Sequence, residues 1–523
     1  MVRSLAVAIR ALPRAGTVPE QQPGGRSPLA APAAGIEQAR CRTARGGAVA
    51  GQGPGCRPLG AGGAALWQRG DAAHPWRRRG AGRRHPAQGL CRPEGRRHGL
   101  ALLPPMPRVL IAWELGEAFG HLARCLRLAQ GLMARGHGVT LALKDVRLPA
   151  GQRPAPGITV LPAPLTPQAG TGSSPPVNYA DVLRVSGFAE AQDVVARLNA
   201  WRGILTLAQP DVLVADHAPT ALLAARLANI PHLSIGNGFA IPPAVSPWPS
   251  IRPWEAVSDQ ALMAAEERLD RVLEAAQKAL GHASAVRMRD LFGAHDILDT
   301  FAELDHYGAR PDGRYVGPIV SVPQALRVGW QNREGCRVLA YLRPAVPGFE
   351  SILQALARLD AEVLCIAPGI RPEAAKRCAT RRLRIALAPI DLSLLLPHAD
   401  LALGYGNSGF STQALLAGVP LAMRPRHVEQ TLFAHRVEEL GAGKLLSGRI
   451  DVDSVTTSLQ ELLGNPTYRQ AARAFRDRHA DYSPSEAIEQ SLFAIERAML
   501  EGWNTDRTRK TPEPQESPPA CLH

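Results

Sequence analysis

The chain has 523 residues, 45% of them hydrophobic, and a formal net charge of +14. Its length allows two or three domains, each with a core of its own. The charge is confined to one segment: residues 1–105 carry 17 arginines, no lysine and four acidic residues, a net charge of +13, and the remaining residues together carry +1. This balance excludes a protein whose fold is basic throughout, so we expect no nucleic-acid partner.

Residues 1–105 are rich in Gly, Ala, Pro and Arg and contain no Phe, Tyr or Asn. So few large apolar side chains cannot bury enough surface to offset the chain entropy, and we predict a disordered extension. A basic arm for nucleic acid, an organelle transit peptide and an over-extended reading frame all fit this composition. The last fits best, because a folded pattern begins abruptly at Met106.

No apolar run reaches the roughly 18 residues that a membrane span needs. The stretch "SLAVAI" near the amino terminus is too short for a secretory signal and is interrupted by Arg10. The cysteines show no C-x-x-C spacing. We therefore expect a reduced, metal-free protein in the cytoplasm.

From Met106 to residue 314 the sequence alternates between strand and helix patterns. "RVLIAW" (108–113) is a continuous apolar run, which is typical of a strand buried on both faces of a parallel sheet. A glycine-containing loop, a helix ending at Gly136 and the strand "VTLAL" (139–143) follow. Further along come a helix around 189–207, the strand "PDVLVAD", the helix "PTALLAARLANIP", the strand "HLSIG" and a charged helical region at 255–290.

Residues 315–335 are irregular and are interpreted as a linker between domains. A second alternating series fills 336–502, with strands "CRVLAYL", "EVLCIA", "LRIAL", "DLALG", "PLAM" and "KLL" and with helices at 349–359, 372–381, 391–397, 410–417 and 429–440. The pattern predicts an α/β protein of two Rossmann-like, doubly wound domains that face a cleft, at 106–314 and 336–502. Residues 503–523 are expected to form a disordered tail.

One stretch of the second series, "ALGYGNSGFSTQALLAGVPLAMRPRHVEQ" (402–430), combines glycines and hydroxyl residues between a strand and a helix. Gly406 and Gly409 allow close backbone approach to a ligand, and the start of a helix favours anions. Ser408, Ser411 and Thr412 could donate hydrogen bonds to a diphosphate. A tight strand-to-helix turn capped by Ser408 explains the same residues equally well. The spacing is neither a Walker loop nor G-x-G-x-x-G.

The order of these residues resembles the UDP-glycosyltransferases of the GT-B fold. Their carboxy-terminal signature runs approximately H-G-G-x-G-T-x-x-E-A-L-x-x-G-V-P, followed by a proline and D-Q. The matching residues here are Tyr405, Gly406, Asn407, Ser408, Gly409, Phe410, Ser411, Thr412, Gln413, Ala414, Leu415, Gly418, Val419, Pro420, Pro425, Glu429 and Gln430. The "YVGP" of the linker and the "GHLARCLRLAQGLMARGHGVTLA" near Met106 resemble the family as well, so the likeness covers about 106–490.

The resemblance implies a donor site for a nucleoside diphosphate sugar in the second domain. Tyr405 stands where the family has a histidine that binds the diphosphate, and it keeps a hydrogen-bond donor but cannot become cationic. Gln413 stands where the family has a glutamate on the ribose, and it keeps an acceptor but loses the charge. Glu429 and Gln430 match the Asp-Gln pair that holds the sugar.

Three further positions of the donor site follow from the same likeness. The 406–412 loop, Asn407 included, would hold the diphosphate. Arg343, with Pro344, replaces the family's Gly-Ser after the first strand of this domain; it either supplies the charge that Tyr405 lacks or is a solvated surface residue. The backbone after Pro389 would form the edge that binds the base.

In the first domain the resemblance assigns the catalytic base to His121, within Gly120-His121. A histidine at the carboxyl end of the first strand can take a proton from an acceptor hydroxyl. Asp216, after the strand "VLVAD", would hold the imidazole tautomer. Without the resemblance, Asp216 is better interpreted as a cap of the helix that follows. His137, in the "RGHGVT" turn, is interpreted as a structural residue.

The sequence thus predicts an inverting, metal-independent glycosyltransferase without a cofactor, whose co-substrate is a UDP- or dTDP-sugar and whose acceptor is a hydroxyl on a small or lipophilic molecule. Peripheral contact with a membrane stays open. Two alternatives also stay open: a catalytically degenerate binding or partner subunit, suggested by Tyr405 and Gln413, and a sugar-nucleotide epimerase. The acceptor would be chosen by the variable loops at 162–180 and 236–256, from which its identity cannot be read.

Overall fold

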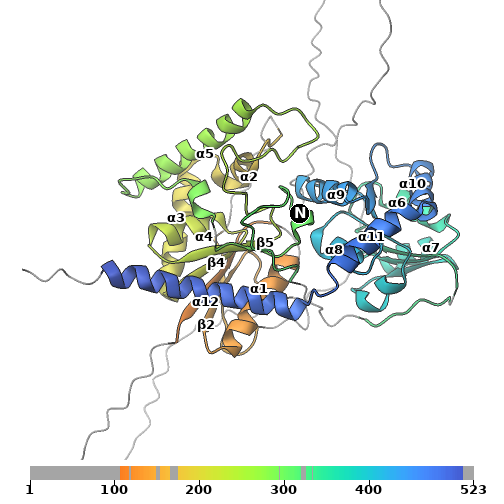
Figure 1. The fold of residues 1–523 in the computed structure, drawn as a ribbon, viewed down its shortest axis with the longest axis horizontal. Coiled ribbons are helices and arrows are strands. Elements are labelled where there is room, and N and C mark those ends of the chain that lie inside the picture. Colours follow the sequence, from red (N-terminus) through yellow and green to blue (C-terminus); the bar gives the residue numbers. More distant parts are fainter. Residues whose placement is uncertain are drawn as a thin grey trace, which may run out of the picture. The chain divides into compact units, whose positions relative to one another are not determined.

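The computed structural model describes residues 106–116, 119–148, 154–164, 175–293, 295–319, 326–332 and 334–509. The predictions for the Arg-rich extension at 1–105 and for residues 510–523 lie outside these ranges. Two parallel sheets form the fold (Figure 1), as the alternating sequence pattern predicts. Neighbouring strands of the two sheets pair in parallel throughout the described residues.

The first sheet has six strands in the order β3-β2-β1-β4-β5-β6. The strands are β1 Arg108–Trp113, β2 Gly138–Leu143, β3 Thr159–Pro162, β4 Val212–Asp216, β5 His232–Gly236 and β6 Ile297–Leu298. The helices are α1 Phe119–Ala134, α2 Tyr179–Leu183, α3 Ala191–Ala208, α4 Pro219–Leu227 and α5 Asp259–Ala279. All five residues of β4 and the last five of β1 are buried, as a central parallel strand covered on both faces requires.

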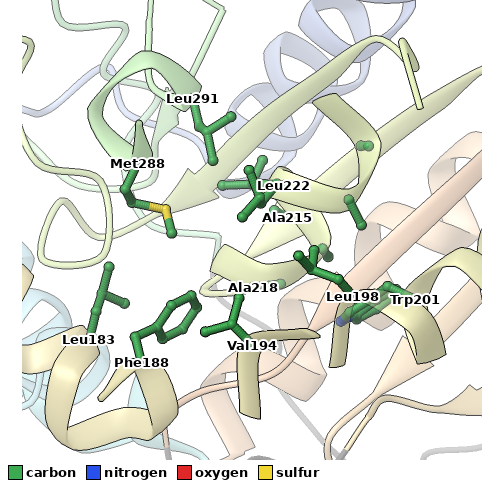
Figure 2. Packing of buried hydrophobic residues seen from close by; sticks show 14 of the residues in the cluster. Leu183, Phe188, Val194, Leu198, Trp201, Ala215, Ala218, Leu222, Met288 and Leu291 are labelled. Atoms are coloured by element: carbon green, nitrogen blue, oxygen red, sulfur yellow. The ribbon is translucent and has the colours of Figure 1, made fainter. Parts of the chain in front are cut away.

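One face of this sheet is closed by α3, α4 and α5, whose apolar residues form a continuous core with it. Figure 2 shows part of this packing: Leu222 of α4 lies beside Ala215 of β4, and Leu198 and Trp201 of α3 belong to the same cluster. Trp201 is fully buried, and its indole N–H donates to the carboxylate of Glu114. A large aromatic ring with one satisfied polar atom suits such a core.

The second sheet has the order β12-β11-β10-β7-β8-β9. Its strands are β7 Arg337–Tyr341, β8 Glu362–Ile366, β9 Leu383–Ala386, β10 Leu401–Gly404, β11 Leu421–Met423 and β12 Gly443–Leu445. Its helices are α6 Phe349–Ala357, α7 Pro372–Cys378, α8 Ser408–Leu416, α9 Val428–Glu439, α10 Val452–Gly464 and α11 Pro466–Arg478.

One α-helix predicted for the part of the chain that forms the second sheet, at 391–397, is wrong. Residues 391–397 form two short 3-10 turns, Leu392–Leu394 and Leu396–His398, instead of one α-helix. The physical reason is Pro397, which has no N–H to continue an α-helical ladder and fits only the first turn of a new helix. Asp391 caps the first turn by accepting from the Ser393 N–H at 3.0 Å.

The last helix, α12 (Pro484–Arg509), returns to the first sheet (Figure 1). Its buried residues share one core with α1 and β1. We call the part of the molecule built on the first sheet the first half and the part built on the second sheet the second half; α12 therefore belongs to the first half, although it follows the second half in the sequence. The prediction that 336–502 forms one domain is corrected here, and the helix also continues past 503 to Arg509. The contact is close because Gly131 of α1 lacks a side chain: a Cβ there would lie 2.6 Å from Leu492 Cδ1.

Charged residues reinforce this contact at its rim. Arg135 pairs with Glu489 and Glu496 at 2.5 and 2.6 Å. His137 Nε2 lies 3.0 Å from Glu496 Oε1. The histidine that the sequence analysis interprets as structural is therefore held by α12.

Candidate active site

His121 and Asp216 come together at the carboxyl edge of the first sheet. His121 lies in the first turn of α1, just after β1, and Asp216 is the last residue of β4, the neighbour of β1. His121 Nδ1 lies 2.7 Å from Asp216 Oδ1, and the two side chains are 19% and 1% exposed. A carboxylate at this distance accepts the Nδ1 proton and leaves the Nε2 lone pair free, the state that a general base needs.

The imidazole is fixed on two further sides. Trp113 stacks on it with ring centroids 5.6 Å apart and an interplanar angle of 14°. Gly116, at φ +82°, lies so close that a Cβ on it would be 2.5 Å from His121 Nε2. The Gly116 carbonyl accepts from Lys144 Nζ at 2.8 Å. Only glycine combines this backbone conformation with such an approach to the ring.

Asp216 does not cap α4, the alternative that its sequence position suggested. The N-cap residue is Ala218, which makes no side-chain cap; the Glu114 carboxylate instead accepts from the Thr220 N–H of the first turn at 2.9 Å and from the Trp201 indole N–H. Burial raises the pKa of Glu114 to about 7, against the lowering effect of these hydrogen bonds and of Arg197. Asp216 is thereby left to the histidine and to a partner that the sequence analysis missed.

That partner is Arg124, one turn after His121 on α1. Its Nη1 donates to Asp216 Oδ1 at 2.7 Å, and its Nε lies 2.7 Å from Asp299 Oδ2. The spacing of three residues on one helix face could have suggested Arg124. Asp299 gives no such signal, because it follows β6 and lies 175 positions away from Arg124 in the sequence.

The predicted donor loop lies between β10 and α8. Tyr405 is only 4% exposed, and its hydroxyl accepts from the Arg343 backbone N–H at 2.6 Å. Burial raises the pKa of Tyr405 to about 12, so the side chain is a neutral phenol near pH 7. This side chain, longer than histidine, reaches the backbone after β7, and the predicted contact of its hydroxyl with a diphosphate stays a prediction.

Positive charge is nevertheless present beside this loop. The Arg426 guanidinium lies 5.7 Å from the centre of the Tyr405 ring. Arg426 is exposed and Arg343 half-buried, and both act on Tyr405 electrostatically by lowering its pKa, against the larger effect of burial. Arg426 was missed by the sequence analysis, which considered only Arg343 as a source of charge.

The hydroxyl residues of the loop divide into two groups. Ser408 is half-buried, whereas Ser411 and Thr412 are fully buried within α8, so the prediction that all three present hydroxyls to a ligand is corrected for the last two. Their burial follows from the packing of one side of α8 against its own sheet and α11, whereas Ser408, Gly409 and Gln413 stay partly or fully exposed. Asn407 is half-buried and Gly409 exposed.

Gly406 and Gln413 also take defined positions. Gly406 has φ +75°, and a Cβ there would lie 2.8 Å from the Gln430 carbonyl oxygen, so glycine is required where the loop passes α9. Gln413 is half-buried, and its side-chain amide donates to the Gly409 carbonyl at 3.0 Å. The Gln413 carboxamide therefore lies along the first turn of α8.

The predicted sugar-binding pair opens α9. Glu429 Oε1 accepts from Asn237 Nδ2 at 2.8 Å, and the same amide lies 3.3 Å from Ser408 Oγ. The pKa of Glu429 is lowered to about 2: burial would raise it, but His427, His306 and the Asn237 amide outweigh that effect. Gln430 Oε1 accepts from the Arg426 N–H at 2.9 Å.

Asn237 follows β5 directly, so it joins the carboxyl edge of the first sheet to residues of the second half. The sequence shows it only as a polar residue after a predicted strand.

The predicted base-binding edge, the backbone after Pro389, makes hydrogen bonds within the protein. The Pro389 carbonyl accepts from the Leu326 N–H at 3.2 Å, and the Asp391 N–H donates to the Leu326 carbonyl at 3.0 Å.

Among the described residues, no helix is long and apolar enough to cross a membrane. Within the same ranges, no group of three or more His, Cys, Asp or Glu side chains is placed to hold a metal ion. The described cysteines, Cys125, Cys336, Cys365 and Cys378, are free thiols.

Comparison with known proteins gives consistent results. Residues 350–494 match the family described as erythromycin biosynthesis protein CIII-like, C-terminal domain. A PGL/p-HBAD biosynthesis glycosyltransferase of Mycobacterium tuberculosis is 27% identical over 295 residues, which cover 53% of this chain and 68% of that protein. A PGL/p-HBAD biosynthesis rhamnosyltransferase of Mycobacterium bovis is 25% identical, over 51% and 63% of the two chains.

Solved structures share the fold. The calicheamicin glycosyltransferase CalG4 superposes with a TM-score of 0.57 at 21% identity, over 75% of this chain and 99% of its own. The spinosyn rhamnosyltransferase SpnG, complexed with thymidine diphosphate, gives a TM-score of 0.53 at 19% identity, over 74% and 99%. At such identities the likeness establishes the two-sheet architecture alone.

Proposed function

Because this chain is a glycosyltransferase of the GT-B fold, we propose that it moves a sugar from a UDP or dTDP donor to a hydroxyl group, with inversion at the anomeric carbon and without a metal ion. The observation that carries the proposal is the 2.7 Å contact between His121 Nδ1 and Asp216 Oδ1. A buried carboxylate that holds one ring nitrogen and leaves the other open is the arrangement that general-base activation of a hydroxyl requires.

In the proposed reaction the acceptor hydroxyl gives its proton to His121 Nε2 while its oxygen attacks the anomeric carbon. The bond between that carbon and the diphosphate oxygen breaks, and the nucleoside diphosphate leaves with the electron pair. Attack from the side opposite the leaving group inverts the configuration. Asp216, which keeps the Nδ1 proton, stabilises the imidazolium that forms.

Charge on the departing diphosphate would be met by the amino-terminal turn of α8, where Asn407, Ser408 and Gly409 lie nearest the surface. Arg343 and Arg426 add two cations beside Tyr405. Together these groups provide the stabilisation that a divalent ion supplies in other transferases, which is why we propose a metal-independent reaction.

The remaining predicted donor-site residues would bind either the transferred sugar or the ribose of the nucleotide. Glu429, which is ionised, would accept hydrogen bonds from sugar hydroxyls, and Asn237 would keep its carboxylate oriented. Gln430 would join it, and Gln413 would face the ribose. We propose a small or lipophilic acceptor; support comes from the spinosyn rhamnosyltransferase, which has been solved with spinosyn aglycone and shares this fold.

A nucleotide panel tests the donor site directly. We expect the melting temperature of the full chain to rise with UDP or dTDP, and less with GDP or ADP, because a ligand that binds only the folded state stabilises it by about 2.7 kcal/mol at a concentration 100 times its Kd. Differential scanning fluorimetry with each nucleotide titrated separately is the measurement. No shift with any nucleotide, in a cooperatively melting sample, would favour a degenerate partner subunit. Turnover of the donor sugar in the absence of an acceptor would favour an epimerase.

Replacement of Gln413 with glutamate tests the ribose contact. A carboxylate cannot donate to the Gly409 carbonyl as the amide does, so it should turn outward and bind ribose hydroxyls more strongly than the amide. The gain of about 1 kcal/mol that separates charged from neutral hydrogen bonds corresponds to a Kd about fivefold lower. Calorimetric titration of the nucleotide measures it; an unchanged Kd would place Gln413 outside the site.

A further inference from the structure

We propose that Arg124 and Asp299 are positioning residues that set the charge around His121 and thereby its strength as a base. The inference rests on the proposed function, in which His121 accepts the proton. It concerns two residues that neither the sequence analysis nor the resemblance assigns, and it predicts where the acid limb of the pH profile lies.

The geometry is a chain of contacts that runs inward from the imidazole. Asp216 Oδ1 receives both His121 Nδ1 and Arg124 Nη1, each at 2.7 Å, so one oxygen is shared by the base and the cation. The other side of the guanidinium meets Asp299 Oδ2 at 2.7 Å. Arg124, Asp216 and Asp299 are all buried, so water screens their charges little.

The charge of this cluster depends on the proton that His121 carries. With Asp216 and Asp299 ionised and Arg124 cationic, the cluster has a charge of −1 when the imidazole is neutral and 0 when it is protonated. Without the Asp299 charge, the same step would go from 0 to +1. Buried clusters disfavour net charge, so Asp299 makes proton uptake by His121 more favourable.

Arg124 alone would have the opposite effect. It competes for the oxygen that binds His121 and places a cation near the imidazolium, which weakens the base. Asp299 offsets that cation. The pair therefore holds Asp216 in place without withdrawing its negative charge from the histidine.

The state of Asp299 is consistent with this arrangement. Burial raises its pKa to about 6, against the lowering effect of Arg124, while Asp216 raises it further. Asp299 Oδ1 is buried and has no hydrogen-bond partner among the described residues, as expected for a carboxylate that is held by a single cation. The carboxylate is therefore ionised at the pH 8 used for kcat below, where its charge acts on the histidine.

Other charged or titratable groups face His121 from the elements packed around it, and they are the same in the variants below. They are His217 after β4, Glu429 on α9 and Lys144 after β2, which donates to the Gly116 carbonyl; Cys125 on α1 contacts Asp216. Burial, followed by the effect of His121, lowers the pKa of His217 to about 4, so it is neutral at the pH of the assay. The thiol pKa of Cys125 is raised by burial, so it too is neutral.

Asp299→Asn is the first test, with kcat/KM measured against pH for the full chain. Removing the negative charge makes the imidazolium less favourable, so His121 loses its proton at lower pH. The acid limb should move down by about one pH unit, the size of shift that one nearby charge produces, and kcat at pH 8 should fall about threefold because the base is weaker. If Asp299→Asn does not fold, Asp299→Ser carries the same expectation.

The double variant Arg124→Gln/Asp299→Asn provides the rescue. It removes one charge of each sign and returns the cluster to −1 with a neutral imidazole, so its acid limb should return to within a few tenths of a pH unit of the wild-type position. Glu303→Gln is the matched control: this carboxylate lies four residues after Asp299 but pairs with Arg478 and His479. Its loss should leave the acid limb in place.

The outcomes separate this inference from the proposed function. An acid limb that stays at the wild-type pH in Asp299→Asn, or that does not return in the double variant, overturns the inference and leaves His121 as the base. A wild-type profile without an acid limb, or an active His121→Ala enzyme, would instead overturn the proposed function.

Discussion

Replacing His121 with alanine is expected to lower kcat by about 10²–10⁴-fold, the contribution that a positioned general base makes to a proton-transfer step. The acceptor hydroxyl would then have to lose its proton to water during attack. The Kd for the nucleoside diphosphate should change less than twofold, because the groups proposed to bind it lie in the second half. Single-turnover kinetics and nucleotide titration measure the two quantities separately.

His137→Ala is the matched control for this substitution. Its imidazole also lies in the first half and is also held by a carboxylate, at 3.0 Å from Glu496, but at the α12 contact. It should melt at a lower temperature with kcat unchanged. If His121→Ala loses nucleotide binding and turnover to the same extent, His121 acts on the structure of the site and is not the base.

Leu492→Ala is expected to lower the free energy of unfolding by 2–5 kcal/mol, the usual range for removing a buried leucine side chain. Leu492 is 1% exposed and lies against the backbone at Gly131, where a glycine makes room for it. Alanine leaves a cavity that a rigid helix pair cannot close. Urea unfolding monitored by circular dichroism should give a lower midpoint with an unchanged slope.

Phe493→Ala is the control on the adjacent position of the same helix. Phe493 is 64% exposed, so its removal should change the unfolding free energy by less than 0.5 kcal/mol. Equal effects of the two substitutions would mean that α12 does not pack on α1 through Leu492.

The sequence predicts most strands well because each is a short continuous apolar run. The run at 232–236 has the same bounds in the structure, and the run at 108–113 is β1. A parallel strand buried on both faces leaves this pattern whatever its partners are. The α-helix predicted at 391–397 is wrong because the prediction left out Pro397, which has no N–H to continue the α-helical hydrogen bonds.

The position of α12 could not be predicted in the same way. An amphipathic pattern shows that a helix has a buried face, but not which core receives it. The deciding feature is the fit of Leu492 to Gly131, two residues 361 positions apart. Shape complementarity between distant segments leaves no periodic signal.

The candidate site also has features that the sequence predicts and features that it does not. His121 lies in the first turn of the helix after β1, and Asp216 ends the adjacent strand β4, so their approach follows from the parallel sheet. The resemblance placed Tyr405 on the diphosphate, but the structure turns its hydroxyl to the backbone of Arg343. Asp299 joins the site through Arg124 alone, and no local pattern reveals a buried ion pair of that kind.

The return of α12 to the first core makes the second sheet an insertion within the first half. The chain contributes to that core before β7 and again after α11, so the first half is not a single continuous stretch of sequence. If the second half binds the donor, as proposed, an engineer who wished to change donor specificity could not join two proteins at one crossover point. The exchanged cassette would have to be internal, running from β7 to α11, with α12 kept from the protein that supplies α1.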